Sequence, residues 1–112
     1  MYKTFASGNL TADARTFDYS GKSATQFTIG SKTSTKNDKG EYISNFISVA
    51  VFGPQANSCA RLKKGDKVTV IGDTCVQPYT TRDGKQGYNI NVRADSVDFM
   101  SPPKQEPDIF GN

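Results

Sequence analysis

Two phenylalanine side chains within residues 45–53 have the spacing of a surface that could bind flat ligands. Successive side chains of a β-strand point to opposite faces, so residues two apart share a face. Phe46 and Phe52 share one face, and the residues between them on that face, Ser48 and Ala50, are small. Small neighbours leave the flat side of each ring open for stacking against another planar group. The alternative is a strand buried on both faces, which would place both rings in a core.

Basic and aromatic residues elsewhere in the chain extend this chemistry toward a flexible polyanion. Unpaired nucleobases expose flat faces, and stacking on an aromatic ring contributes roughly 1–3 kcal/mol per base. Phosphates attract lysine and arginine side chains, so such binding weakens as the salt concentration rises. The candidate binding residues are the interleaved aromatic and basic ones, namely Phe46, Phe52, Tyr79, Lys32, Lys36, Lys39, Arg82 and Lys85.

Some of these assignments have plain alternatives. A tyrosine packed at a sheet edge would have the same sequence context as Tyr79. The lysines of residues 32–40 are equally compatible with a soluble loop that contacts nothing. Solvated or structural positions, rather than contacts to nucleic acid, are favoured for Lys63, Lys64, Lys67 and Arg93.

The elements that position these residues are mostly strands. Residues 11–15 and 19–22 are predicted as loop or turn, and residues 33–40 as a flexible polar hairpin loop. Strand patterns cover residues 2–10, 24–31, 45–53, 68–72, 74–81 and 87–97. The apolar faces of two of these strands are predicted to fill the core with Phe27, Ile29, Ile47, Val49 and Val51.

One helix interrupts the strands. Residues 55–62 contain good helix formers, Pro54 suits a first helical position, and Gly65 suits a stop. One short helix between the third and the fourth strand is the order of an OB-fold, an all-β, partly open, five-stranded barrel. The face of the second and third strands is the usual binding surface of that fold, and Phe46 and Phe52 fall on it.

Length and composition favour a binding domain over an enzyme. The 112 residues are assigned to a domain over residues 1–100 and a short disordered tail over residues 101–112. The chain has no histidine, so it lacks an imidazole base and a histidine metal ligand. It shows no phosphate-binding glycine loop and no cysteine cluster, and neither a cofactor nor a metal is expected.

Charge, hydropathy and cysteine use bear on location. The net charge of +3 favours a polyanionic partner without requiring one. There is no run of about eighteen apolar residues and no N-terminal signal pattern, so no membrane association is expected. Cys59 and Cys75 are interpreted as reduced thiols of a cytoplasmic protein, with a single disulfide as the alternative.

Several motifs together resemble the bacterial single-stranded DNA-binding proteins of the SSB type over residues 1–100. They are GNLTAD at residues 8–13, SVAVFG at residues 48–53, LKKGDKVTVIG at residues 62–72, and the later order Tyr79, Asp83, Gly84, Tyr88. The resemblance implies that Phe46 and Tyr79 replace base-stacking tryptophans and that Phe52 takes the place of a stacking phenylalanine. It also implies that the chain binds and protects single-stranded DNA, without sequence specificity, during replication or recombination.

The chain departs from that family in its aromatic residues. It has no tryptophan, and the family's first stacking tryptophan falls near Thr35. This difference has two interpretations. Either the chain binds each nucleotide more weakly, or Tyr42 takes the place of the missing tryptophan.

The C-terminal residues also differ from the family pattern. Asp108, Ile109 and Phe110 are similar to the family's partner-recruiting tip, but Gly111 and Asn112 follow them. A weak contact with a replication protein and a disordered end without a partner both fit this sequence.

The resemblance further implies a homodimer or homotetramer. Tyr2 and Phe5 would serve such a contact or fill the core, and a subunit interface could also cover one of the stacking rings. A compact chain of this kind suits a phage, plasmid or other mobile element in a bacterial cell. The competing hypothesis is an OB-fold protein-interaction module of a primosome or secretion assembly, with only weak nucleic-acid binding.

Overall fold

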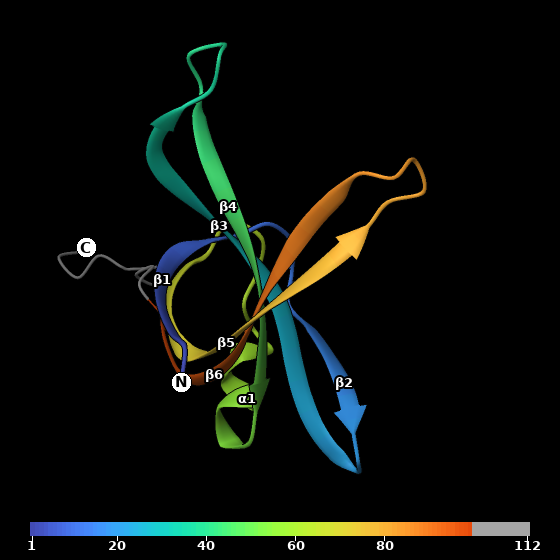
Figure 1. Cartoon of the computed structure of the whole chain (residues 1–112). Coiled ribbons are helices and arrows are strands. Elements are labelled where there is room, and N and C mark those ends of the chain that lie inside the picture. Colours follow the sequence, from blue (N-terminus) through green and yellow to red (C-terminus); the bar gives the residue numbers. More distant parts are fainter. Residues whose placement is uncertain (100–112) are drawn as a thin grey trace, which may run out of the picture.

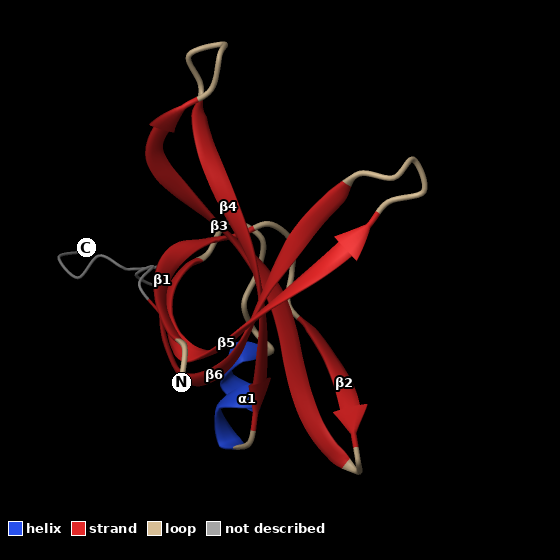
Figure 2. Cartoon of the chain, viewed as in Figure 1, coloured by secondary structure: helices blue, strands red, loops and turns tan. Residues whose placement is uncertain are grey.

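The computed structural model describes residues 1–99, which form six strands and one helix (Figures 1 and 2). In chain order they are β1 (Lys3–Leu10), β2 (Arg15–Tyr19), β3 (Lys22–Lys36), β4 (Tyr42–Phe52), α1 (Pro54–Cys59), β5 (Lys67–Thr80) and β6 (Gln86–Phe99). No helix in this part of the chain is long and apolar enough to cross a membrane.

Five of the strands close into a ring. The order in the sheet is β1-β5-β6-β4-β3-β2, and β1 also pairs with β3 through Asn9 with Gly30 and Leu10 with Ile29. All pairings are antiparallel except that of β4 with β6. Strand β2 lies outside the ring, on the free edge of β3 (Figure 1). The predicted five-stranded, partly closed barrel is therefore confirmed, with β2 as an additional strand.

The core fills the inside of this ring. Ile29, Val49 and Val51 are almost fully buried, as their alternating positions predict. Burying such a side chain stabilises the fold by about 1.5–3 kcal/mol. Helix α1 is attached to the core by Thr25, whose buried hydroxyl donates to the Ala56 carbonyl oxygen at 2.7 Å.

Helix α1 is shorter than the predicted residues 55–62. Its last i to i−4 hydrogen bond runs from the Ala60 amide to the Ala56 carbonyl oxygen. The amides of Arg61 and Leu62 donate instead to residues three positions earlier, which is the tighter turn found at helix ends. This turn buries Leu62, and Gly65 lies in the following loop rather than directly after the helix.

Several predicted boundaries are wrong for identifiable reasons. No strand was predicted between the loop of residues 11–15 and the turn of residues 19–22, but residues 15–19 form β2, and residues 33–36 belong to β3 rather than to the loop. The loop itself is short because the Asn37 side-chain oxygen accepts the amides of Lys39 and Glu41. Residues 68–72 and 74–80 lie in one strand, β5, because the break expected near Gly72 is a shift in register and not an end.

Two long hairpins project from the ring. In Figure 1 the far ends of the β3–β4 and β5–β6 hairpins extend to the side opposite α1. The Asp83 and Gly84 turn predicted at the tip of β5–β6 is present, with Gly84 at a φ of 86°. We refer to these hairpins as the β3–β4 arm and the β5–β6 arm.

Candidate nucleic-acid interface

One face of the sheet points away from the core and continues across five strands. Directly paired residues on neighbouring strands carry their side chains on the same side. Ala50 pairs with Gln26 and Arg93, and Ser48 pairs with Thr28 and Asn91. By the same register, the surface that we call the outer face holds Phe17, Tyr19, Gln26, Thr28, Phe46, Ser48, Ala50, Phe52, Cys75, Gln77, Tyr79, Asn91 and Arg93.

Phe46 presents an open ring on this face. Its side chain is 61% exposed, so the alternative of a strand buried on both faces is wrong. Its partner across the β3–β4 pair is Gly30, and a Cβ atom at Gly30 would lie 3.3 Å from Phe46 Cε1. The ring therefore lies over bare backbone on one side and is free on the other.

Tyr79 repeats this arrangement on the β5–β6 arm. It pairs with Gly87, and a Cβ atom at Gly87 would lie only 2.5 Å from Tyr79 Cζ and Oη. The tyrosine does pack against a neighbouring strand, as the sheet-edge alternative supposed, yet 44% of its surface remains exposed. Tyr88, on the opposite face of the same arm, is 67% exposed.

Phe52 is more enclosed than the sequence suggested. The Arg93 guanidinium lies over its ring, with Cζ 4.5 Å from the ring centroid. Tyr19 makes an edge contact at 5.3 Å between centroids, and Phe17 makes another at 6.4 Å. The sequence favoured a solvated or structural position for Arg93, away from nucleic acid. The structure instead places Arg93 on the outer face, beside the candidate stacking residue Phe52.

The contributions of β2 to this face were missed because no strand was predicted between the loop of residues 11–15 and the turn of residues 19–22. A signal was available in their alternation, with Phe17 and Tyr19 separated by the polar Asp18. A two-residue period of this kind is typical of a strand. Recognising it would have predicted a strand here, with both aromatic rings on one of its faces.

The predicted basic residues divide between the two arms. Lys32 and Lys36 lie on β3, Lys39 lies in the loop that follows, and Arg82 and Lys85 lie at the β5–β6 tip. Lys36 Nζ stands 5.0 Å from the centroid of the Tyr42 ring, which remains half exposed.

Lys32 also borders a hollow beside Phe46. The hollow has a volume of about 440 Å³ and is lined in part by Gly30, Lys32 and Lys67. Lys67 had been assigned a structural position, but the fold places it with Lys32 at this hollow. Lys63, by contrast, lies 3.9 Å from the Asp13 carboxylate, in agreement with a structural position.

The β5–β6 tip is ordered by local hydrogen bonds. The Thr81 hydroxyl donates to Asp83 at 2.5 Å, and this bond holds the pKa of the Asp83 carboxyl below its usual value. Asp83 is therefore ionised at neutral pH and reduces the positive charge between Arg82 and Lys85. These two cations still project from a defined turn and not from a flexible loop.

The two cysteines are free and lie in different environments. Burial raises the pKa of the Cys59 thiol to about 11, whereas Cys75 is exposed on the outer face. In residues 1–99 no three histidine, cysteine, aspartate or glutamate side chains are grouped in a way that could hold a metal ion.

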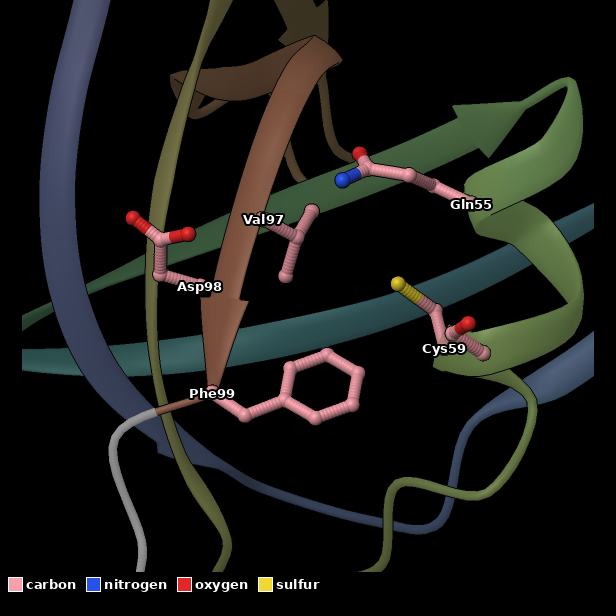
Figure 3. A pocket seen from close by; sticks show the side chains of 6 residues that line it. Gln55, Cys59, Val97, Asp98 and Phe99 are labelled. Carbon is pink, nitrogen blue, oxygen red and sulfur yellow. The ribbon is translucent and has the colours of Figure 1, made fainter.

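A smaller hollow beside α1 lies apart from these residues. Gln55 and Cys59 of α1 face Val97 and Phe99 at the end of β6 (Figure 3). Its volume is about 230 Å³ and its charged lining residue is the anionic Asp98. An anionic hollow of this kind is poorly suited to a phosphate backbone, so we do not include it in the candidate interface.

Comparisons with known proteins identify the class of protein. Residues 1–100 match the Single-strand binding protein family. The chain is 32% identical over 108 residues to Single-stranded DNA-binding protein 1 of Clostridium acetobutylicum, covering 94% of this chain and 98% of that relative. It is 33% identical over 105 residues to Single-stranded DNA-binding protein 1 of Staphylococcus aureus, covering 91% of this chain and 67% of that relative.

A solved structure shows the same fold. The small single-stranded DNA-binding protein from Streptomyces coelicolor superposes with a TM-score of 0.71 at 19% identity, covering 88% of this chain and 94% of that one. The ring of strands with a short helix between β4 and β5 is accordingly an OB-fold of the type found in these proteins.

The chain belongs to the Single-strand binding protein family. The resemblance seen in its motifs is thus confirmed. Membership of this non-enzymatic DNA-binding family also confirms the prediction that the chain is not an enzyme.

Proposed function

We propose that this protein binds single-stranded DNA through its outer face, without regard to base sequence. The observation that carries the proposal is the pair of open rings, Phe46 and Tyr79, each lying over a glycine of the neighbouring strand. Every base has a flat face, so stacking on such rings tolerates any sequence. The DNA is held by its bases on the sheet and by its phosphates at the arms.

The glycines support this mechanism because they hold the rings before a ligand arrives. Phe46 over Gly30 and Tyr79 over Gly87 each have one side covered by the protein and one side open. A side chain that is already in its bound position loses little conformational entropy on binding. Both rings would therefore accept a base with little rearrangement.

The charge distribution supports a phosphate backbone as the second contact. Residues 1–99 carry thirteen lysines and arginines against nine aspartates and glutamates. Lysines lie on or near both arms, and Lys32 and Lys67 border the hollow beside Phe46. Each phosphate that such cations neutralise releases counterions and makes the affinity depend on salt.

We infer further that the protein acts on single strands during replication or recombination in the bacterial cytoplasm, as a homodimer or homotetramer. Tyr2 and Phe5 are 63% and 73% exposed, which supports a contact between subunits through β1. An origin in a phage, plasmid or other mobile element stays a prediction. The predicted partner contact of Asp108, Ile109 and Phe110 lies outside the described residues.

A binding titration tests the proposal against the alternative of a protein-interaction module. Fluorescently labelled oligo-dT is titrated with the protein at two salt concentrations, beside a duplex of the same length. We expect tight binding of the single strand, weak binding of the duplex, and a lower affinity at the higher salt concentration. Equal affinity for both DNA forms, or no binding, would favour the interaction module.

Variants of the two rings test the stacking mechanism. Phe46→Ala and Tyr79→Ala should each reduce the affinity for oligo-dT by roughly 1–3 kcal/mol, the contribution of one stacked base. Tyr88→Ala is the matched control, because it removes an exposed tyrosine from the opposite face of the same arm. Stacking would be excluded if Phe46→Ala and Tyr79→Ala bound oligo-dT as tightly as Tyr88→Ala does.

A further inference from the structure

A third hollow lies at the end of the outer face, beyond Phe52. It has a volume of about 370 Å³ and is lined by Tyr19, Ser20, Lys22, Phe52, Gly53 and Arg93. Ligand sites in proteins commonly have volumes of roughly 300–1,000 Å³, so a single nucleotide is within its capacity. The lining contains two rings and two cations, and no carboxylate.

The arrangement of these residues differs from the open platforms at Phe46 and Tyr79. Arg93 lies over the Phe52 ring, which leaves the guanidinium as the surface that a ligand would meet. Arginine stacks on nucleobases by its planar guanidinium, and a lysine cannot replace it in this role. Tyr19 is 56% exposed, so its own ring is also accessible.

The charged groups nearby leave the two cations available. The register places Asp73 beside Arg93, but Lys3 Nζ contacts the Asp73 carboxylate at 3.0 Å. Asp18 precedes Tyr19 on β2 and is carried on the other side of that strand. The hollow is thus bordered by positive charge suited to a phosphate.

We propose that this hollow is a nucleotide subsite, in which a base stacks on Arg93 and Tyr19 while Lys22 contacts the adjoining phosphate. Phe52 supports Arg93 from below and is a positioning residue there. The proposal rests on the proposed function, because the nucleotide is taken to belong to the strand on the outer face. Phe46 and Phe52 are six residues apart on β4, about 20 Å at the usual rise of a strand.

The test compares oligo-dT strands of increasing length, over roughly the 4 to 16 nucleotides that OB-folds cover. Strands that are too short to reach from Phe46 to the hollow should bind Arg93→Lys and Tyr19→Ala as tightly as the unmodified protein. Longer strands should bind these variants roughly 5- to 150-fold more weakly, the range expected for one stacked base. Thermal melts check that both variants remain folded.

A salt series separates the phosphate contact from stacking. Affinity falls as salt rises, so the slope of log affinity against log salt is negative. Lys22→Ala should make this slope less steep by about 0.7, the value for one phosphate of a single strand. Arg93→Lys keeps its charge and should leave this slope unchanged. Lys64→Ala is the matched control, since it removes an exposed lysine that does not line the hollow.

Three results would overturn the subsite. The first is that Arg93→Lys and Tyr19→Ala bind long strands as tightly as the unmodified protein does. The second is that these variants lose the same factor in affinity for oligo-dT of every length. The third is competition by thymidine monophosphate at concentrations close to those of oligo-dT, which would indicate a site for free nucleotides. If Phe46→Ala still weakens binding in any of these cases, the proposed function stands and only the subsite fails.

Discussion

Phe46 and Tyr79 acquire their open position from residues on other strands. Gly30 and Gly87 lie directly opposite them. A Cβ atom at Gly87 would displace the Tyr79 ring, and one at Gly30 would crowd the Phe46 ring. The alternation of residues 45–53 predicted the outward direction of Phe46, because side-chain direction follows from the strand period alone. The support from Gly30 could not be predicted, since it depends on the register between two strands.

Substitution of Gly87 tests whether the ring position matters. Gly87→Ala should weaken oligo-dT binding, because its Cβ would lie 2.5 Å from Tyr79 Cζ and displace the ring. Stability should be unchanged or increased by about 0.4–1 kcal/mol, because alanine restricts the unfolded chain. Affinity and thermal unfolding are measured together.

A double variant provides the control for this prediction. Tyr79→Ala combined with Gly87→Ala should bind no more weakly than Tyr79→Ala alone, because the glycine would act only through the ring. If the losses of binding free energy from Tyr79→Ala and Gly87→Ala added together in the double variant, this explanation would be contradicted. Gly30→Ala should weaken oligo-dT binding less than Gly87→Ala does, since its Cβ would approach Phe46 Cε1 only to 3.3 Å.

Residue types alone did not reveal the surroundings of Phe52. The chain contains Phe17, Tyr19 and Arg93 at three separate places, and only the pairing of β2 with β3 and of β4 with β6 brings them together. These contacts join residues far apart in the sequence. No local pattern contains that information.

Among the elements, the β5–β6 pair determines how the outer face is shaped. Its register shifts between Ile71 and Gly72, where the backbones approach closely. A Cβ atom at Gly72 would lie 2.2 Å from the Arg93 carbonyl oxygen. A glycine at this position therefore permits the close approach of the two backbones beside Arg93.

Gly72→Ala should destabilise the fold. Its Cβ would meet backbone that cannot rotate away, and overpacking of this kind costs about 1–3 kcal/mol. The free energy of unfolding is measured by urea denaturation, with Gly30→Ala as the control because there the neighbouring atoms belong to a side chain. Equal stability of Gly72→Ala and the unmodified protein would contradict the close approach.

The elements were predictable where one face is apolar and the other polar. Residues 24–31 and 45–53 show this pattern, and their inward residues Ile29 and Val49 are fully buried. The lengths of the arms were not predictable, because residues 33–36 are polar on both sides and the pairing with β4 resumes at Lys36 and Tyr42 after a shift in register. Helix α1 was located correctly but ends early because Leu62 turns into the core.

At the scale of the whole molecule, the ring of strands leaves one continuous outer face with an arm on either side. Phe46 lies on β4, Tyr79 lies on the β5–β6 arm, and Cys75 lies on the same face, four residues before Tyr79 on β5, beside Asn91 and in the same row as Ser48. The order of strands and the single helix predicted the OB-fold. The direction of the arms away from α1 is visible only in three dimensions (Figure 1).

The central claim is that single-stranded DNA lies on this face, and alkylation of Cys75 tests it most directly. The exposed Cys75 should react with iodoacetamide in mildly alkaline solution, because its sulfur is accessible to the reagent. Cys59 is the internal control, because burial raises the pKa of its thiol to about 11. Saturating oligo-dT should slow the labelling of Cys75 strongly, and a duplex at the same concentration should not. An unchanged rate with oligo-dT fully bound would place the DNA elsewhere and contradict the claim.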